Sequence, residues 1–248
     1  MKRSSTGLLQ IASILFTVAF GWIILTAVTD DGPGLSMMSA GPNERVSSRY
    51  LAKSVTGPAP GGEVYGNGGF ENGSANIVTS VVVDYRMFDT FGEILVLFAS
   101  AAGVALLMQE RKRNLQREAS SIVKTSVPVI MLFAIIVGFY IIVHGHLTPG
   151  GGFPGGAVLA SAFILQFLAF NRKPRSGAFK AAESLAGLGL LGVGLAGLFL
   201  EGSFFANFLG TGIVGSLFSA GTTAILYTLI GIKVAAELSA LGGGFIGE

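Results

Sequence analysis

The sequence predicts an all-α polytopic membrane protein with about six transmembrane helices, and three observations carry this prediction. Just over half of the 248 residues are hydrophobic, and only 12% are charged. Soluble domains carry about 25% charged residues, so this chain has too little polar surface to cover a water-soluble globule. Its apolar residues gather in long runs, and a helix needs about 20 of them to cross a bilayer core of roughly 30 Å. Helices are expected because each satisfies its own backbone hydrogen bonds in lipid.

Six segments are apolar enough to be spans. The first follows two basic residues but has no small-x-small cleavage site after it, so we expect an uncleaved helix rather than a signal peptide. The second is expected to extend upstream of its apolar run. The segments are residues 8–28, 93–108, 127–143, 155–170, 182–200 and 213–241.

Basic residues orient these spans. They gather at the N-terminus, in the link between the second and third spans, and in the link between the fourth and fifth. With six spans, all three clusters fall on one side, and cytoplasmic loops are the ones enriched in Lys and Arg. We therefore expect a cell-membrane protein with both termini in the cytoplasm. The first outer loop, residues 30–76, is rich in Gly, Pro and Ser and is expected to be irregular; it ends near Asn72, which begins a short Asn-Gly-Ser glycosylation pattern.

Several chemistries have no support in the sequence. Cysteine is absent, which excludes disulfides, thiolate chemistry and Fe–S ligation by this chain. The sequence contains no nucleotide, flavin or metal motif, and no HExxH or GxSxG pattern typical of hydrolases. We therefore expect no cofactor, no bound metal, no nucleic-acid partner and no catalytic residue in this chain.

Ionisable side chains in or near spans are costly, so each is a functional candidate. The stretch "SVVVDYRMFDTFGEILVLF" places Asp84, Arg86, Asp89 and Glu93 at the entrance to the second span. Asp89 and Glu93 are four residues apart, on one helical face, where two carboxylates could share a proton or coordinate sodium. Alternatively, Arg86 neutralises one of the aspartates at the interface. Glu93 has no basic neighbour in sequence and favours a functional role.

The sixth span carries a second candidate pair. Lys233 and Glu237 are also four residues apart. They either form an ion pair that anchors the helix near the interface or act as a step in a buried proton path. Glu183 and Glu201 are expected at the two ends of the fifth span, where long charged side chains reach water by snorkelling.

The connection "HGHLTPGGGFPGG" between the third and fourth spans is the most unusual stretch. No cysteine or nearby carboxylate completes a zinc site with His144 and His146, so the alternatives are a proton relay or gate, since histidine titrates near neutral pH, and structural hydrogen bonding. We expect a re-entrant turn in which Pro149 and Pro154 end helices. Close packing of backbone against backbone is expected at Gly150, Gly151, Gly152, Pro154, Gly155 and Gly156.

Two stretches resemble known families. "HGHLTPGGGFPGGAVLASAFIL" closely resembles the signature of the B subunit of Mrp-type multisubunit sodium/proton antiporters (MnhB-like), whose four helices would cover about residues 119–243. "NIVTSVVVDYRMFDTFGEILVLFASAAGVALL" resembles the E-type subunit of energy-converting membrane-bound hydrogenases, which is also the C-terminal module of the antiporter A subunit. The resemblance implies a two-helix module over residues 1–110, including the loop 30–76, and a four-helix module over residues 111–248.

The resemblance also implies a function. The chain is expected to be an accessory, non-catalytic membrane subunit of a cation and proton antiporter module that packs against other membrane subunits and helps form a sodium or proton path. The two modules are fused without a large antiporter-like subunit, which suits a membrane-bound hydrogenase or a related sulfur-reducing complex. The alternatives are a subunit of a stand-alone Mrp-type antiporter, a purely structural scaffold, an independent transporter, and a membrane enzyme.

Overall fold

The computed structural model describes residues 15, 17–19, 21–22, 48–50, 72–108, 119–171 and 176–244. The chain divides into two compact units, residues 1–49 and 50–248. In the first unit, the described positions are helical. The rest of the predicted first span and most of the predicted irregular loop lie outside the described residues.

The second unit is built from helices, as predicted. The described residues contain no strand, and five of their helices are long and apolar enough to cross a membrane. These five correspond to the second to sixth predicted spans, and the prediction of an all-α polytopic membrane protein is confirmed. The described elements are α3 (Ile77–Thr79), the π-helical turn η3 (Ser80–Tyr85), α4 (Met87–Met108), α5 (Ser121–Val143), α6 (Gly152–Phe170), α7 (Ser176–Glu201) and α8 (Thr222–Gly244).

The predicted starts of the third and sixth spans are wrong for local reasons. The third span begins at Ser121 rather than residue 127, because the Ser120 side chain caps the helix by accepting a hydrogen bond from the Val123 amide, and Pro128 lies inside the helix. The sixth span begins at Thr222 rather than residue 213. Residues 213–221 form turns instead, with left-handed backbone at several positions including Ala220 (φ 68°), a conformation that an α-helix does not accept.

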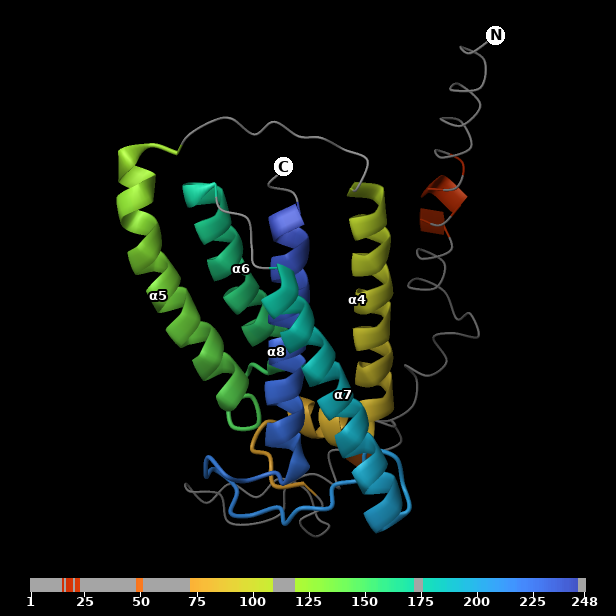
Figure 1. Ribbon diagram of the computed structural model, residues 1–248. Helices are drawn as coiled ribbons and strands as arrows, with labels where there is room; N and C mark the ends of the chain where they lie inside the picture. Colours follow the sequence, from red (N-terminus) through yellow and green to blue (C-terminus); the bar gives the residue numbers. More distant parts are fainter. Residues whose placement is uncertain are drawn as a thin grey trace. The chain divides into compact units, whose positions relative to one another are not determined.

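Helix α8 lies at the centre of the second unit and contacts each of α4, α5, α6 and α7 (Figure 1). It is also the most buried of the five spans. This position explains why α8 has apolar or small residues on all sides rather than one stripe. The largest buried side chains at its contacts include Leu226, Ile230 and Val234.

Glycines bring α6 against both of its neighbours. A Cβ atom at Gly156 would lie 2.8 Å from the Gly231 carbonyl oxygen on α8, and one at Gly155 would lie 2.8 Å from the Gly138 carbonyl oxygen on α5. These are distances that real Cβ atoms do not show. Small residues let helix backbones approach closely in membranes, so the spacing of α5, α6 and α8 depends on them.

Candidate functional site

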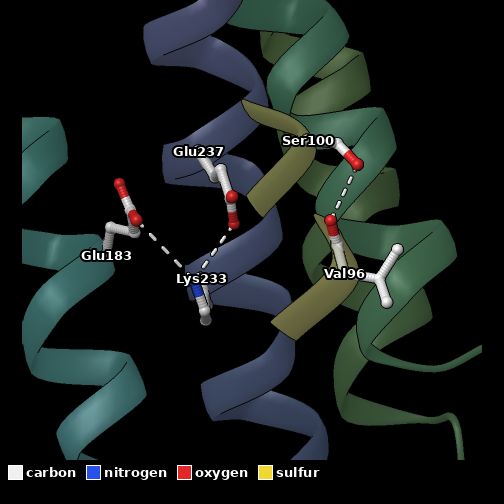
Figure 2. Close-up of polar contacts among 5 residues, drawn as sticks. All are labelled: Val96, Ser100, Glu183, Lys233 and Glu237. Carbon is white, nitrogen blue, oxygen red and sulfur yellow. Dashed lines mark hydrogen bonds and ion pairs between the residues drawn. The ribbon is translucent and has the colours of Figure 1, made fainter. Parts of the chain in front are cut away.

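The described spans hold one group of buried charges, formed where α7 meets α8. Lys233 lies near the middle of α8, and its Nζ is 3.1 Å from Oε2 of Glu237, one turn further along the helix. The same Nζ lies 3.7 Å from Oε1 of Glu183 on α7. Figure 2 shows both carboxyl groups pointing toward the Lys233 ammonium from different helices. Lys233 is 6% exposed and Glu237 is 2% exposed, so the pair is removed from lipid and solvent.

A cavity of about 390 Å³ adjoins this cluster on the side of α4. The Phe98 ring of α4 forms part of its wall, with its centroid 5.0 Å from the Lys233 ammonium, within the range of a cation–π interaction. The neighbouring Ser100 hydroxyl donates to the Val96 carbonyl within α4 (Figure 2). The lining residues are mostly small and apolar: Phe98, Ala101, Ala102, Ala105, Lys180, Glu183, Glu237, Ala240, Leu241 and Gly244.

Sequence reasoning missed part of this cluster. It placed Lys233 and Glu237 on one helical face and gave an anchor near the membrane interface as one alternative, whereas the pair lies near the middle of α8. It assigned Glu183 to snorkelling at a helix end, which is wrong. Helix α7 begins at Ser176 rather than residue 182, so Glu183 lies within the span and reaches Lys233. The available signal in the sequence was Glu183 itself, because it lies within the predicted span of residues 182–200. Glu201 is exposed at the other end of α7, as expected.

The acidic stretch before α4 is arranged differently from a shared-proton site. Arg86 and Asp89 form an ion pair in which both side chains are more than half exposed, and Arg86 Nε also donates to Asp89 Oδ2 over 2.7 Å. Glu93, one turn further along α4, is exposed. The geometry therefore matches neutralisation of an aspartate by Arg86, the second of the two interpretations drawn from the sequence. None of these three residues lines the cavity.

Asp84 lies in η3 and has a close polar partner. The Asn72 side-chain amide donates to Asp84 Oδ2 over 2.6 Å, and Asn72 is fully buried. The Asn72 side-chain nitrogen is the atom to which a glycan would be attached. The glycosylation pattern at Asn72 is therefore not usable in this fold, because the amide is buried and already engaged.

The two histidines have different surroundings. His144 ends α5, where its ring stacks on Tyr140 with centroids 4.2 Å apart and its Nδ1 lies 3.2 Å from the Tyr140 carbonyl oxygen. His146 is fully buried, with Nε2 3.4 Å from the Ser216 carbonyl oxygen and no hydrogen-bond partner for Nδ1 among the described residues. Burial lowers the pKa of His146 below its ordinary value, more than the Ser216 and Leu217 carbonyl groups raise it.

A polar layer ties the glycine turn to α3 and α8. The Tyr227 hydroxyl donates to Thr79 Oγ1 over 2.7 Å, and the Thr79 hydroxyl donates to the Gly145 carbonyl over 2.6 Å. The Asn76 side-chain amide donates to the Gly145 and Thr148 carbonyl groups, each over 3.0 Å. These bonds satisfy the backbone of an irregular connection that would otherwise be costly to bury.

The turn itself needs glycine at Gly151. Its φ is 131° and a Cβ atom there would lie 2.7 Å from the Tyr227 ring, so both the backbone conformation and the space exclude a side chain. The turn joins two helices that are each long enough to cross the membrane, rather than forming a re-entrant loop. Pro154 does not end a helix, which corrects that expectation: it lies in the first turn of α6, where the missing amide hydrogen would have had no helical partner.

The predicted site residues thus fall into three places within the second unit. Lys233 and Glu237 meet at the buried charge cluster, the histidines and glycines form the turn with its polar layer, and the acidic stretch flanks the start of α4. Among the described residues, no group of three or more His, Cys, Asp or Glu side chains is arranged to hold a metal ion. Of the three places, the buried charge cluster is the best candidate for ion chemistry, because its charges lie inside spans.

Comparisons with known proteins agree with this architecture. Residues 122–240 match the domain related to the MnhB subunit of Na+/H+ antiporter, and residues 34–125 match the MbhE family, the E subunit of MBH. An uncharacterized protein of Methanocaldococcus jannaschii is 33% identical over 196 residues, which cover 66% of this chain and 74% of that protein.

Two solved structures are also similar. A chain in the structure of the membrane-bound sulfane sulfur reductase, an archaeal respiratory membrane complex, superposes with a TM-score of 0.72 and 37% identity over 97% of this chain and 99% of that chain. A chain of the Mrp complex from Dietzia sp. DQ12-45-1b shares the fold, with a TM-score of 0.64 and 21% identity; the match covers 99% of this chain but 26% of that one.

These matches confirm both resemblances drawn from the sequence. The MbhE match contains the segment from Asn72 to the end of α4, and the MnhB match contains the glycine turn and most of α8, including Tyr227. The hydrogen bonds of the polar layer therefore join one matched region to the other. Five apolar helices together with these relatives make the chain a multi-pass membrane protein. The chain joins a region that matches the MbhE family to a domain related to the MnhB subunit of Na+/H+ antiporter, and it belongs to the same family as the matched chain of the sulfane sulfur reductase complex.

Proposed function

We propose that this chain is an accessory, non-catalytic membrane subunit of an ion-translocating complex in the cell membrane, and that it contributes part of the ion path. The family supports the first part, since its matched relatives are membrane subunits of antiporter and respiratory complexes. Near full-length similarity to a chain of a sulfane sulfur reductase complex supports a parent complex with a redox arm, such as a sulfur-reducing complex or a membrane-bound hydrogenase. A stand-alone Mrp-type antiporter is the alternative parent.

The observation that carries the ion-path role is the buried charge cluster. A charge inside a span is costly and persists in proteins where it pairs with others or serves a path. Lys233 contacts a carboxyl group on its own helix and another on α7, so one ammonium can pair with either. An ion pair whose partner can change is an element able to pass charge from one side of the cluster to the other.

The cavity supports the same role, because it connects the buried charge cluster with residues near the end of α8. Its wall runs from Glu237 along small residues of α4 and α8 to the exposed Lys180 and to Gly244 near the end of α8. The ends of α4, α6 and α8 and the start of α5 lie at the same end of the unit (Figure 1). Because the two basic links follow these helix ends in the sequence, we propose that this end of the second unit faces the cytoplasm. We also propose that both chain termini are cytoplasmic.

The remaining candidates take lesser roles in this proposal. Glu93 is exposed on α4, so we propose that it faces another subunit of the complex. His146 is buried against the loop after α7, where burial lowers its pKa, and we propose that it responds to pH. His144 and the ion pair of Arg86 with Asp89 are proposed to be structural, and the turn glycines are proposed to support packing and assembly. We also propose that the two-helix module ends at residue 110 and that the four-helix module begins at residue 111.

Two measurements on one preparation test this function. A tagged chain purified in mild detergent should elute with other membrane subunits, whereas elution as a lone monomer would favour an independent transporter. The complex carrying Lys233→Gln should then assemble but transport ions poorly after reconstitution into vesicles, with Lys124→Gln, which does not line the cavity, as the matched control. Normal transport by an assembled Lys233→Gln complex would leave the chain as a structural scaffold.

A further inference from the structure

The buried charge cluster does not balance its own charges. Lys233 contributes one ammonium group, while Glu183 and Glu237 contribute two carboxyl groups within 4 Å of it. If all three were ionised, one net negative charge would remain among side chains that are largely buried within the spans. An uncompensated buried charge is strongly unfavourable, so something must neutralise it.

Among the residues that the structure describes, the neighbouring helices offer no second buried cation. Helix α6, which packs along α8, has no ionisable residue, and α4 presents only Phe98 and alanines to the cavity, its Asp89 and Glu93 being exposed. On α5, Lys124 does not line the cavity. On α7, Lys180 lines it but is exposed and forms no ion pair with a described carboxyl group. Water screens such an exposed cation, which therefore compensates the buried cluster poorly.

The hydrogen bonding of Glu237 gives independent evidence that the negative charge of the cluster is neutralised. Its Oε2 accepts a hydrogen bond from Lys233, but its Oε1 is buried and has no hydrogen-bond partner among the described residues. An ionised carboxylate accepts hydrogen bonds at both oxygens, and a buried one without partners is costly. This oxygen belongs to a residue that lines the cavity, from which a proton could reach it.

We propose that the cluster is a proton-binding site: Glu183 and Glu237 share one proton, and Lys233 pairs with whichever carboxyl group is ionised. The proton adds to a carboxylate oxygen and leaves from it again, so no other reactant is needed. With distances of 3.1 Å and 3.7 Å to the two carboxyl groups, the ammonium can exchange partners by a small movement of its flexible chain. The proposal deepens the ion path proposed above and rests on it by assigning the proton as the ion at this point.

Sodium does not fit the same place. A hard metal cation is bound by several oxygen ligands, and apart from the two carboxyl groups and the Lys180 ammonium the described lining of the cavity consists of alanine, leucine, glycine and phenylalanine side chains. The Lys233 ammonium already occupies the position between the carboxyl groups and repels a second cation. The cluster therefore selects the proton, which needs one oxygen atom.

Infrared difference spectroscopy of the purified complex tests this count of protons near neutral pH. A protonated carboxyl group has a carbonyl stretch that shifts in D2O and is separate from that of carboxylates. We expect the wild-type complex to show one such band that both Glu183→Gln and Glu237→Gln remove, because either change leaves one Lys and one Glu. Lys233→Gln should raise the band roughly twofold, because both carboxyl groups then need protons. Glu201→Gln, at the exposed end of α7, should leave it unchanged.

The wild-type complex alone can overturn the proposal, even if every variant fails to assemble. If no band sensitive to D2O appears, a cation from elsewhere in the complex neutralises the cluster. If saturating sodium removes the band, the site exchanges sodium for the proton and does not select between them. The infrared band reports protonation of a carboxyl group and not transport. If the band is present but Lys233→Gln leaves transport normal, the ion path is refuted while the proton-binding site stands.

Discussion

Replacing Gly156 with alanine tests whether close backbone packing sets the spacing of α6 and α8. The added Cβ atom would lie 2.8 Å from the Gly231 carbonyl oxygen and 2.9 Å from Val234 Cβ. Neither neighbour is the free end of a flexible side chain, so one helix must shift. Gly192, in the middle of α7, provides the matched control, because a Cβ atom there meets nothing within 4 Å.

The expected size of the effect follows from comparing the two variants. Alanine is favoured over glycine in a helix by about 1 kcal/mol, and this gain applies to both positions. Overpacking of a well-packed interior costs about 1–3 kcal/mol, and this cost applies only to Gly156→Ala. The Gly156 variant should therefore unfold with a free energy roughly 1–3 kcal/mol lower than that of the Gly192 variant.

Denaturant unfolding of the purified chain in mild detergent, followed by circular dichroism, measures this difference. The isolated chain is the right material, because in the complex Gly192 is free to meet another subunit. If Gly156→Ala is as stable as Gly192→Ala, the helices have room to separate, and the close packing of α6 against α8 is not what fixes their spacing.

Two further outcomes concern His146 and the ion pair of Arg86 with Asp89. Burial holds the pKa of His146 below its ordinary value of 6.5, so the unfolded chain binds more protons than the folded chain as pH falls through 6.5, and the free energy of unfolding should drop there. His146→Gln should therefore flatten the dependence of this free energy on pH between about 8 and 5. An identical pH profile in both proteins would contradict a lowered pKa of the buried imidazole. Arg86→Gln breaks an ion pair whose side chains are more than half exposed, so it should lower the free energy of unfolding by less than about 1 kcal/mol, and by less still in high salt. A larger loss would mean that this ion pair is shielded from solvent.

The sequence predicted the spans well because their signal is composition. A run of apolar residues with few charges identifies a span wherever it lies, and the five described spans all begin or end near predicted positions. The errors lie at helix starts. Ser120 and Ala220 decide where α5 and α8 begin through a side-chain cap and a left-handed backbone, and neither has a strong signature in hydropathy.

The site was harder to predict because it depends on which helices meet. The i, i+4 spacing of Lys233 and Glu237 is visible in the sequence, since both lie on one helix. Glu183 comes from another helix, and only the packing of α7 against α8 brings it to Lys233. The same is true of Tyr227 and Thr79, whose hydrogen bond joins residues 148 positions apart. No local pattern encodes such pairs.

Proton flux through the assembled complex in vesicles tests the central claim most directly. Glu237→Gln keeps the shape of the side chain at the buried charge cluster but cannot carry a proton, whereas Glu201→Gln makes the same change at the exposed end of α7. We expect Glu237→Gln to lower the proton flux on the order of tenfold or more, as expected when a positioned proton-transfer group is lost, and Glu201→Gln to leave it unchanged. An assembled Glu237→Gln complex with wild-type proton flux would contradict the account, because the cluster would then have no part in the ion path.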